Sequence, residues 1–480
     1  MKTKSSCQLV APILATMALG AFASLRGAPP APAPRPNILF ILSDDQGWGD
    51  VGFHGSDIKT PNLDKLAAQG AQLDQFYVQA LCSPTRASLL TGRYPIRYGL
   101  HVGVVRPHAQ YSIPLDERLL PQALREAGYT TAITGKWHLG TPSAEYLPTR
   151  RGFDHQYGLY NGNFDYFTHL RDGGLDWHRD DKALREEGYA TNLIAREAAR
   201  LITEHRADKP LFLYVAFNAV HSPYQVPDRY TEPYAHLKGN RRTYAGMVAA
   251  MDEGIGEILA ALEKKGLREN TLIFFCSDNG GPQPGVITSN GPLRGGKSTL
   301  YEGGVRVPAV AVWDGRIKPG SKVGAPLHMV DWYPTLLKLA GAPLEQPLPI
   351  DGRDAWAAIA EGAPSPREEI LHNVTTTGGA VRVGDWKLVV NGQMVDGLEG
   401  GTPSAAREKE KAAAIAAPRI ELFDLKSDPC EKTNLAESHP EKVKELRARL
   451  EAYAKAAAPS KQAPASPDFK VPAVWGEFGG

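Results

Sequence analysis

The stretch NILFILSDDQGWGD, residues 37–50, decides the fold class of this chain. It opens with an apolar run, Asn37 to Ser43, and two aspartates follow at once. A short apolar run bounded by turn residues is typical of a strand that is buried on both faces of a parallel sheet. Ligands of such sheets bind beyond the carboxyl ends of the strands. Asp44 and Asp45 therefore mark a candidate functional site.

Similar apolar runs recur along the chain and alternate with amphipathic helical patterns. The patterns predict strands over residues 130–134, 211–218, 271–277 and 308–313, and helices around residues 116–127, 190–207 and 241–265. This alternation predicts an α/β domain with a large, mainly parallel sheet that is covered by helices on both faces.

The pattern changes near residue 365, where hairpin-like segments are followed by one long helical pattern. We therefore expect a main domain over residues 36–365 and a smaller C-terminal α+β subdomain over residues 366–480. Within this subdomain, the low complexity of residues 392–418 indicates a surface insertion. The last twenty residues are rich in Pro and Ala, which predicts a loosely held tail.

The N-terminus has the composition of a targeting segment. Lys2 and Lys4 precede an apolar run that closes on small residues, which predicts a secretory signal peptide over residues 1–23. A Pro/Ala spacer over residues 24–35 follows it. No later segment has the length and apolarity of a membrane span. We therefore expect an exported protein without a stable membrane anchor.

Charge and cysteine content argue against a nucleic-acid-binding protein and against a disulfide-rich one. The chain has 54 Lys and Arg against 53 Asp and Glu, a net charge of +1, which argues against nucleic-acid binding through a general basic surface. Of the four cysteines, Cys7 leaves with the predicted signal, and the remaining three form no disulfide framework. Cys276 lies in an apolar run and is expected to be buried, and the position of Cys430 predicts nothing. Cys82 needs another explanation.

A second pair of polar residues follows another predicted strand. Asp278 and Asn279 come directly after the run TLIFFCS, as Asp44 and Asp45 follow the first strand. Either pair alone would suit a cap or a turn. Both pairs together, at the ends of apolar strands, favour a site for Ca²⁺ or Mg²⁺, since these cations prefer oxygen ligands.

Four basic side chains share the same predicted edge of the sheet. Lys136 and His138 follow the strand TTAIT, and residues two apart in an extended segment face the same side. His221 follows the strand LFLYVAFN, and Lys297 lies in a Gly-rich loop. Each could be an exposed lysine or a histidine satisfied within its own loop. Their common location favours a joint role.

The stretch LCSPTRASLL places Cys82 beside a helix N-terminus. Ser83 suits an N-cap and Pro84 the first helical position, and the helix is expected to end near Gly92. Backbone N–H groups at a helix N-terminus attract anions. Arg86 follows Cys82 by four residues and so shares its helix face. The arrangement predicts an anion site.

Three interpretations of Cys82 compete. A buried structural cysteine would need neither Pro84 nor Arg86. A thiolate phosphatase loop would place its arginine six residues after the cysteine, with glycines between. The third interpretation is a resemblance: LCSPTRASLLTGRYPIRYGL is similar to the signature of the sulfatase family, in which the cysteine of C-x-P-x-R is oxidised by a dedicated enzyme to Cα-formylglycine.

This resemblance extends over most of the chain after the predicted signal. NILFILSDDQGWGDVGFHGS, TPNLDKLAAQG, LPTRRGFD, SDNGG, LRGGKSTLYEGGVRVP and VDWYPTLLKLAG all resemble sulfatase segments, in the order of that family. DVGFHGS, GRYPIRYGL and PLDERLLPQALREAGYTT are most similar to its arylsulfatase B branch, the N-acetylgalactosamine-4-sulfatases. The resemblance implies an alkaline-phosphatase-like fold. The chain lacks the disulfide cysteines of animal members, which suggests a bacterial enzyme that is periplasmic or secreted.

The resemblance implies a metal and a modified nucleophile. One Ca²⁺ would be held by Asp44, Asp45, Cys82, Asp278 and Asn279. Residue 82, as formylglycine, would be hydrated to a geminal diol whose hydroxyl attacks sulfur. Arg86 and His138 would steady the diol, with Asp278 as its base. A formylglycine-generating enzyme is then a partner during maturation.

The resemblance also implies how the sulfate is held and released. Lys136 and Lys297 would clamp the sulfate oxygens, and His221 with Lys297 would protonate the departing sugar oxygen. Metal, fixed cations and an acid are what sulfuryl transfer to water requires, because negative charge moves onto a poor leaving group.

The implied substrate is a sulfated carbohydrate. The arylsulfatase B likeness favours a 4-O-sulfate on N-acetylgalactosamine or galactose, with algal galactans such as carrageenan as the alternative. Aromatic and imidazole groups suit the mixed surface of a sugar, and His54, His101 and Trp313 are candidates for the wall that faces the ring.

Two rival functions use the same fold. A metal-dependent phosphodiesterase needs a second metal site and a Ser or Thr nucleophile, whereas this chain offers Cys82, and lysines where a second metal would want carboxylates. A non-catalytic protein that binds sulfated glycans would be expected to have lost a catalytic group, and every implied group is present.

Overall fold

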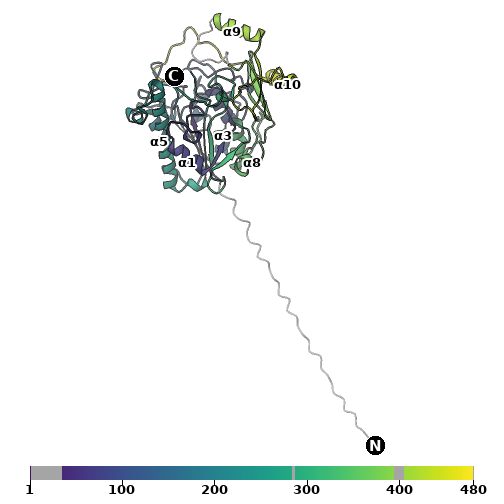
Figure 1. Cartoon of the computed structure of the whole chain (residues 1–480). Coiled ribbons are helices and arrows are strands. Elements are labelled where there is room, and N and C mark those ends of the chain that lie inside the picture. Colours follow the sequence, from purple (N-terminus) through teal and green to yellow (C-terminus); the bar gives the residue numbers. More distant parts are fainter. Residues whose placement is uncertain (2–34, 284–286, 394–404, 479–480) are drawn as a thin grey trace. The chain divides into compact units, whose positions relative to one another are not determined.

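A computed structural model describes Met1 and residues 35–283, 287–393 and 405–478 (Figure 1). The predicted signal peptide and spacer, apart from Met1 and Arg35, lie outside the described residues, as does part of the predicted insertion. Residues 35–480 cluster into one unit, which contains every element discussed below.

The centre of this unit is a ten-stranded sheet in the described part of the chain. Strand β1 (Asn37–Ser43) lies at its middle, between β10 (Leu211–Ala216) and β11 (Thr271–Ser277), and runs parallel to both. The sheet continues beyond β10 through β4 (Thr130–Gly135), β5 (His155–Gly158), β8 (His178–Arg179) and β9 (Lys182–Ala183), and beyond β11 through β12 (Ala309–Val312), β2 (Ala71–Leu73) and β13 (Ser321–Val323). The prediction of a large, mainly parallel sheet is confirmed.

Helices cover both faces of the sheet. Successive side chains of β1 point to opposite faces, and every residue of this strand is buried. Phe40 packs into an apolar cluster with α2 (Cys82–Thr91), α3 (Leu120–Glu126), α7 (Trp332–Leu339) and α8 (Trp356–Glu361). Ile41 packs into a second cluster with α1 (Pro61–Gln69), α4 (Ala190–Glu204) and α5 (Gly239–Lys265). Figure 1 shows α1 and α5 on one side and α8 on the other.

The C-terminal residues form a second, smaller sheet. It is antiparallel and contains β15 (Glu369–Val374), β16 (Gly379–Val383), β17 (Trp386–Val390) and β18 (Ile420–Asp424). Helix α10 (Pro440–Ala456) covers it with Leu446 and Leu450. This confirms the predicted small C-terminal subdomain. Within the region of the predicted insertion, residues Ala405–Ala416 form helix α9, in keeping with the high helix propensity of Ala, Glu and Lys.

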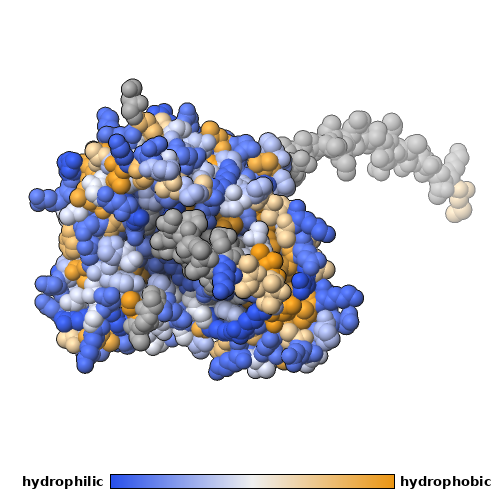
Figure 2. Space-filling model, turned by 90° about the horizontal axis from the view of Figure 1, so that it is seen from above, coloured by the Kyte–Doolittle hydropathy of each residue, from blue (hydrophilic) through white to orange (hydrophobic). Residues whose placement is uncertain are grey.

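The remaining described elements are short. Strands β3 (Phe76–Tyr77) and β14 (Leu327–His328) pair with each other, as do β6 (Leu170–Arg171) and β7 (Gly174–Leu175). Helix α6 (Glu302–Val305) lies between β11 and β12 in the chain. None of the helices in the described ranges combines the length and apolarity that crossing a membrane requires. Figure 2 shows one face of the molecule, which is hydrophilic over most of its area, with apolar side chains in small groups.

The C-terminal residues contact loops of the main domain at several points. Ala458 N–H donates to the Ile96 carbonyl (2.7 Å), and Lys461 N–H donates to the Gly99 carbonyl (2.9 Å). Further along, Trp475 is buried, and its indole N–H donates to the Arg171 carbonyl (2.9 Å). Composition alone does not reveal these hydrogen bonds to distant loops.

A buried ion cluster joins the C-terminal sheet to α6 and β3 of the main domain. Lys387 on β17 places its Nζ 2.9 Å from Glu302 Oε1 on α6 and 2.9 Å from Glu431 Oε1. The Tyr77 hydroxyl donates to Glu302 Oε2 at 2.8 Å. All four side chains are buried. Removing one partner from such a cluster leaves an uncompensated charge away from water.

Lys387→Met is therefore expected to lower the free energy of unfolding by about 3 kcal/mol. Urea denaturation followed by tryptophan fluorescence measures the change. Lys338→Met is the matched control, because the ion pair of Lys338 with Asp354 is exposed to solvent and should add little stability. Equal effects of the two substitutions would show that the buried cluster does not hold the subdomain in place.

Candidate active site

Four oxygen-bearing side chains meet at the carboxyl ends of β1 and β11. Asp44 and Asp45 follow β1, and Asp278 and Asn279 follow β11 in register. Asp45 N–H donates to Asp278 Oδ1 (3.2 Å), and Asn279 Nδ2 donates to Asp45 Oδ1 (2.7 Å). All four residues are buried. The structure thus brings together both pairs of polar residues that the strand ends predict.

Cys82 lies at the N-terminus of α2, as predicted, but the capping differs. Leu81 is the N-cap residue and Cys82 is the first residue of the helix. Ser83 Oγ does not cap the helix; it donates to the His138 carbonyl (2.9 Å) and accepts from Val105 N–H (3.0 Å). The helix ends before Gly92, whose φ of 67° terminates it as expected.

Arg86 connects α2 to the carboxylates. Its Nη2 donates to Asp278 Oδ2 (2.9 Å) and lies 3.4 Å from Asp44 Oδ2. Its Nη1 donates to the Lys136 carbonyl (3.1 Å). The guanidinium is fully buried, so these contacts fix the helix and its first residue relative to the two strand ends.

Two lysines add positive charge to the same cluster. Lys136 Nζ donates to Asp44 Oδ2, and Lys297 Nζ donates to Asp45 Oδ2 (3.0 Å). Three cations, Arg86 and these lysines, therefore face three carboxylates. Because the charges balance, any added divalent cation makes the site net positive and suited to an anion.

The charges around the carboxylates move their pKa values apart. Although burial alone would raise it, the pKa of Asp44 is held below its usual value by Lys136, His221 and Arg86. Burial and the neighbouring Asp44 instead raise the pKa of Asp278 to about 6. Burial also raises the pKa of the Cys82 thiol to about 12, against the opposing effect of Lys136 and Lys297.

Two histidines lie above this cluster. His221 Nε2 is 3.2 Å from Lys297 Nζ and 3.6 Å from Asp45 Oδ2, while its Nδ1 contacts the Ser222 carbonyl (2.6 Å). His138 Nε2 lies 3.1 Å from the Val105 carbonyl. With φ of 54°, His138 is left-handed and not extended, so it does not share the predicted alternation with Lys136. A Cβ at Gly162 would come within 2.6 Å of its ring.

A small cavity of about 50 Å³ opens onto these histidines. Its wall includes the loop that carries Asn163 and Arg171, and a segment that the sequence reasoning missed, Val104–Pro107. Arg106 and Arg171 bring positive charge to the cavity wall. Neither arginine follows a strand of the main sheet, so no pattern in the sequence marked them.

The three predicted sugar-facing residues have different locations. His101 is buried, and it precedes by three residues Val104, which lines the cavity. His54 stacks on Trp48 at a centroid distance of 4.1 Å, within its own loop. Trp313 is a correction: it lies at the opposite edge of the sheet, where its indole N–H donates to the Glu269 carbonyl (3.1 Å). Strand β12 runs antiparallel to β11, so its carboxyl end points away from the site.

The cluster has the donor atoms for a metal ion. Asp44 Oδ1 and Asn279 Oδ1 are buried and have no hydrogen-bond partner among the described residues. Ligand atoms of Asp44, Asp45 and His221 lie within 4.8 Å of one another. Orphaned carboxylate and amide oxygens favour a hard cation, whereas His221 already contacts Lys297.

Comparison with known proteins decides the family. The family model described as Sulfatase matches residues 36–342. The chain belongs to the sulfatase family. It is 38% identical to mouse arylsulfatase J, over 90% of this chain and 78% of that protein. It is 37% identical to mouse N-acetylgalactosamine-6-sulfatase, over 74% of this chain and 72% of the relative.

Solved structures agree with this membership. The crystal structure of Ps i-CgsB in complex with k-i-k-neocarrahexaose superposes with a TM-score of 0.78, at 30% identity, over 89% of this chain and 94% of that one. The predicted sulfatase fold and the predicted class of enzyme, a sulfuric ester hydrolase, are confirmed. In this sulfatase the cluster at the ends of β1 and β11, together with Cys82, is the candidate active site.

Proposed function

We propose that this sulfatase removes a 4-O-sulfate from a galacto-configured sugar of a sulfated carbohydrate, with residue 82 as nucleophile. The observation that carries the proposal is the position of Cys82 at a helix N-terminus, among the charges of the buried Arg86 and Lys136 and of Lys297. Such a site suits the negative charge that sulfuryl transfer places on oxygen.

The ionisation of Cys82 argues against an unmodified thiolate nucleophile. With a pKa raised to about 12 by burial, the thiol stays protonated at neutral pH. Conversion to formylglycine would instead supply a hydrated aldehyde whose hydroxyl attacks the sulfur atom. Because the side chain is fully buried, a formylglycine-generating enzyme would have to act before folding is complete. Export through the predicted signal peptide is part of the same proposal.

The surrounding side chains have distinct roles in this proposal. Asp44, Asp45, Asp278 and Asn279 would hold one Ca²⁺, which supplies positive charge to a sulfate oxygen, and residue 82 completes the set of ligands. Arg86 orients Asp278, the proposed base for the nucleophile. Lys136 and Lys297 bond Asp44 and Asp45, so their ammonium groups lie at the proposed metal site. There they would contact the oxygens of a sulfate bound between the two lysines.

His221 is the proposed acid for the leaving group. When its Nδ1–H donates to the Ser222 carbonyl, Nε2 faces Lys297 and the cavity, where a departing sugar oxygen would need a proton. His138, whose ring contacts the Val105 carbonyl, is the proposed residue that orients the nucleophile.

The alternative of a metal-dependent phosphodiesterase is disfavoured by the same geometry. A second metal would need carboxylates beside the first, and Lys136 and Lys297 occupy those places. A non-catalytic protein that binds sulfated glycans is disfavoured because every implied catalytic side chain is in the cluster or on the cavity wall.

The names of relatives support a carbohydrate substrate but differ on the position of the sulfate. N-acetylgalactosamine-6-sulfatase names a 6-O position, and Ps i-CgsB binds a neocarrahexaose. The arylsulfatase B-like motifs favour the 4-O position, whose axial sulfate would enter the narrow cavity while the ring lies across its mouth. Algal galactans sulfated at that position are the alternative substrate.

A panel of 2-, 4- and 6-O-sulfated galactose and N-acetylgalactosamine tests this specificity. We expect kcat/KM for the 4-O-sulfates to exceed the others by about tenfold, which corresponds to about 1.4 kcal/mol of transition-state discrimination. Free sulfate, measured by ion chromatography, gives the rates. A preference for the 6-O- or 2-O-sulfates would refute the 4-O assignment and leave the sulfatase assignment intact.

A further inference from the structure

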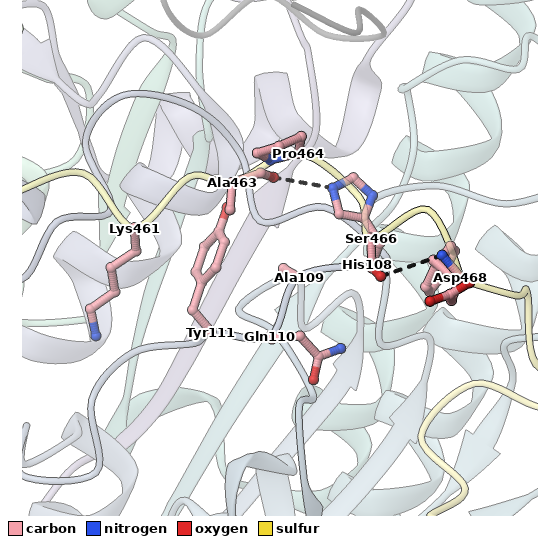
Figure 3. A pocket seen from close by; sticks show the side chains of 10 residues that line it. His108, Ala109, Gln110, Tyr111, Lys461, Ala463, Pro464, Ser466 and Asp468 are labelled. Atoms are coloured by element: carbon pink, nitrogen blue, oxygen red, sulfur yellow. Dashed lines mark hydrogen bonds between the residues drawn. The ribbon is translucent and has the colours of Figure 1, made fainter.

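A second cavity, of about 720 Å³, lies between the loop His108–Tyr111 and the C-terminal tail (Figure 3). Its tail side is formed by residues between Lys461 and Phe469. A volume of this size is typical of sites for small molecules, and it is far larger than the cavity above the two histidines.

One stretch of chain, residues 104–111, borders both cavities. Residues Val104–Pro107 line the small cavity, and the next four residues along the chain line the large one. Val105 ties this loop to the active site, because its N–H donates to Ser83 Oγ on α2 (3.0 Å) and its carbonyl contacts His138. A ligand that follows this loop outward from His138 would meet the residues that line the larger cavity.

The tail that forms the other wall contacts both neighbouring loops. His108 Nε2 contacts the Ala463 carbonyl (3.4 Å), and the His108 ring packs edge-on against Phe469 at 5.8 Å. Phe469 stacks on Trp475 at 6.3 Å, and the Trp475 indole bonds the carbonyl of Arg171, which lines the small cavity. The tail thus spans both loops that border the active site.

We propose that the larger cavity is a subsite for the sugar next to the one that carries the scissile sulfate, and that this neighbouring sugar is anionic. The inference rests on the carbohydrate substrate proposed above. Tyr111 and Phe469 offer aromatic faces for a sugar ring, and Gln110 offers an amide for its hydroxyls. Lys461 supplies the charge that a carboxylate or a second sulfate would pair with.

The two charged side chains of the lining, Lys461 and Asp468, have opposite charges and would favour one orientation of an anionic sugar. Figure 3 shows Lys461 at one end of the lining and Asp468 at the other. Asp468 would repel an anionic group and accept a hydroxyl hydrogen, so the charged group of the sugar belongs at the Lys461 end. No strand end or motif marks this subsite, since the tail and the loop are more than 300 residues apart in the chain.

The test compares substrates of different length. Lys461→Ala and Tyr111→Leu are expected to lower kcat/KM for a sulfated tetrasaccharide about tenfold, while kcat/KM for 4-nitrophenyl sulfate and for N-acetylgalactosamine 4-sulfate stays near the wild-type value. Leucine at 111 retains apolar packing against the core, and a thermal melt verifies that each variant is folded. Lys470→Ala is the matched control, because Lys470 is exposed on the same tail and does not line the cavity.

The tetrasaccharides are those of chondroitin 4-sulfate, chondroitin 6-sulfate and ι-carrageenan, and the variants are compared on the one that the wild-type enzyme hydrolyses fastest. A wild-type preference for the 6-O-sulfate with tenfold losses in the variants would refute the 4-O proposal and support the subsite. The subsite would be overturned if kcat/KM fell equally for the aryl sulfate, the monosaccharide and the tetrasaccharide. It would also be overturned if kcat/KM for the tetrasaccharide did not fall. Hydrolysis of the aryl sulfate alone would overturn both proposals.

Discussion

A Cys82→Ala protein is expected to fold but to hydrolyse an aryl sulfate on the order of 10⁴-fold more slowly than the wild type. Alanine removes the side chain that is proposed to become the nucleophile, while Arg86, Lys136 and Lys297 can still bind the sulfate. Initial rates with 4-nitrophenyl sulfate measure the loss. The binding groups alone should sustain only residual turnover.

Cys276→Ala is the matched control for this substitution. Cys276 is also fully buried, on β11, but its side chain lies in the apolar cluster beneath the site, so its replacement should affect stability more than rate. In the wild-type protein, the tryptic peptide that contains residue 82 should be about 18 Da lighter than its cysteine form. Full activity of purified Cys82→Ala would overturn the nucleophile assignment.

The second large effect is expected at the proposed calcium site. Asp45→Asn should lower activity about a thousandfold and abolish the rise in Tm that Ca²⁺ gives the wild type. The substitution keeps the shape of the side chain but removes a charge that both Lys297 and a metal would use. Differential scanning fluorimetry with EGTA and then with added Ca²⁺ follows Tm, and elemental analysis measures the metal content.

Asp50→Asn separates metal binding from simple loss of a buried carboxylate. Asp50 is buried five residues further along the chain, but it pairs with Arg241 and Tyr244 and not with the cluster. Its substitution should lower Tm while Ca²⁺ still raises it. If zinc were the only metal in active enzyme, or if active enzyme held none, the calcium assignment would be wrong.

Much of the site was predictable because the predicted strands are apolar runs with polar ends. Parallel neighbours β1 and β11 end at the same edge, so Asp44 and Asp278 had to lie close together. The choice of Trp313 for its aromatic side chain was wrong, because a run of apolar residues does not reveal that its strand is antiparallel and ends away from the site. Capping preferences placed the N-cap at Ser83, whose hydroxyl instead bonds the His138 carbonyl.

The sequence by itself determined the class of fold, the family and the cluster of charged groups around Cys82, because each depends on short-range patterns: apolar runs, strand ends and one contiguous motif. Only the tertiary structure decided which partners those groups have and what surrounds them. Arg86 bonds carboxylates at two strand ends, and the tail from Ala458 onward closes a cavity against the loop at His108. These contacts join residues tens to hundreds of positions apart, and their geometry depends on the packing of the whole sheet, which local propensity does not encode.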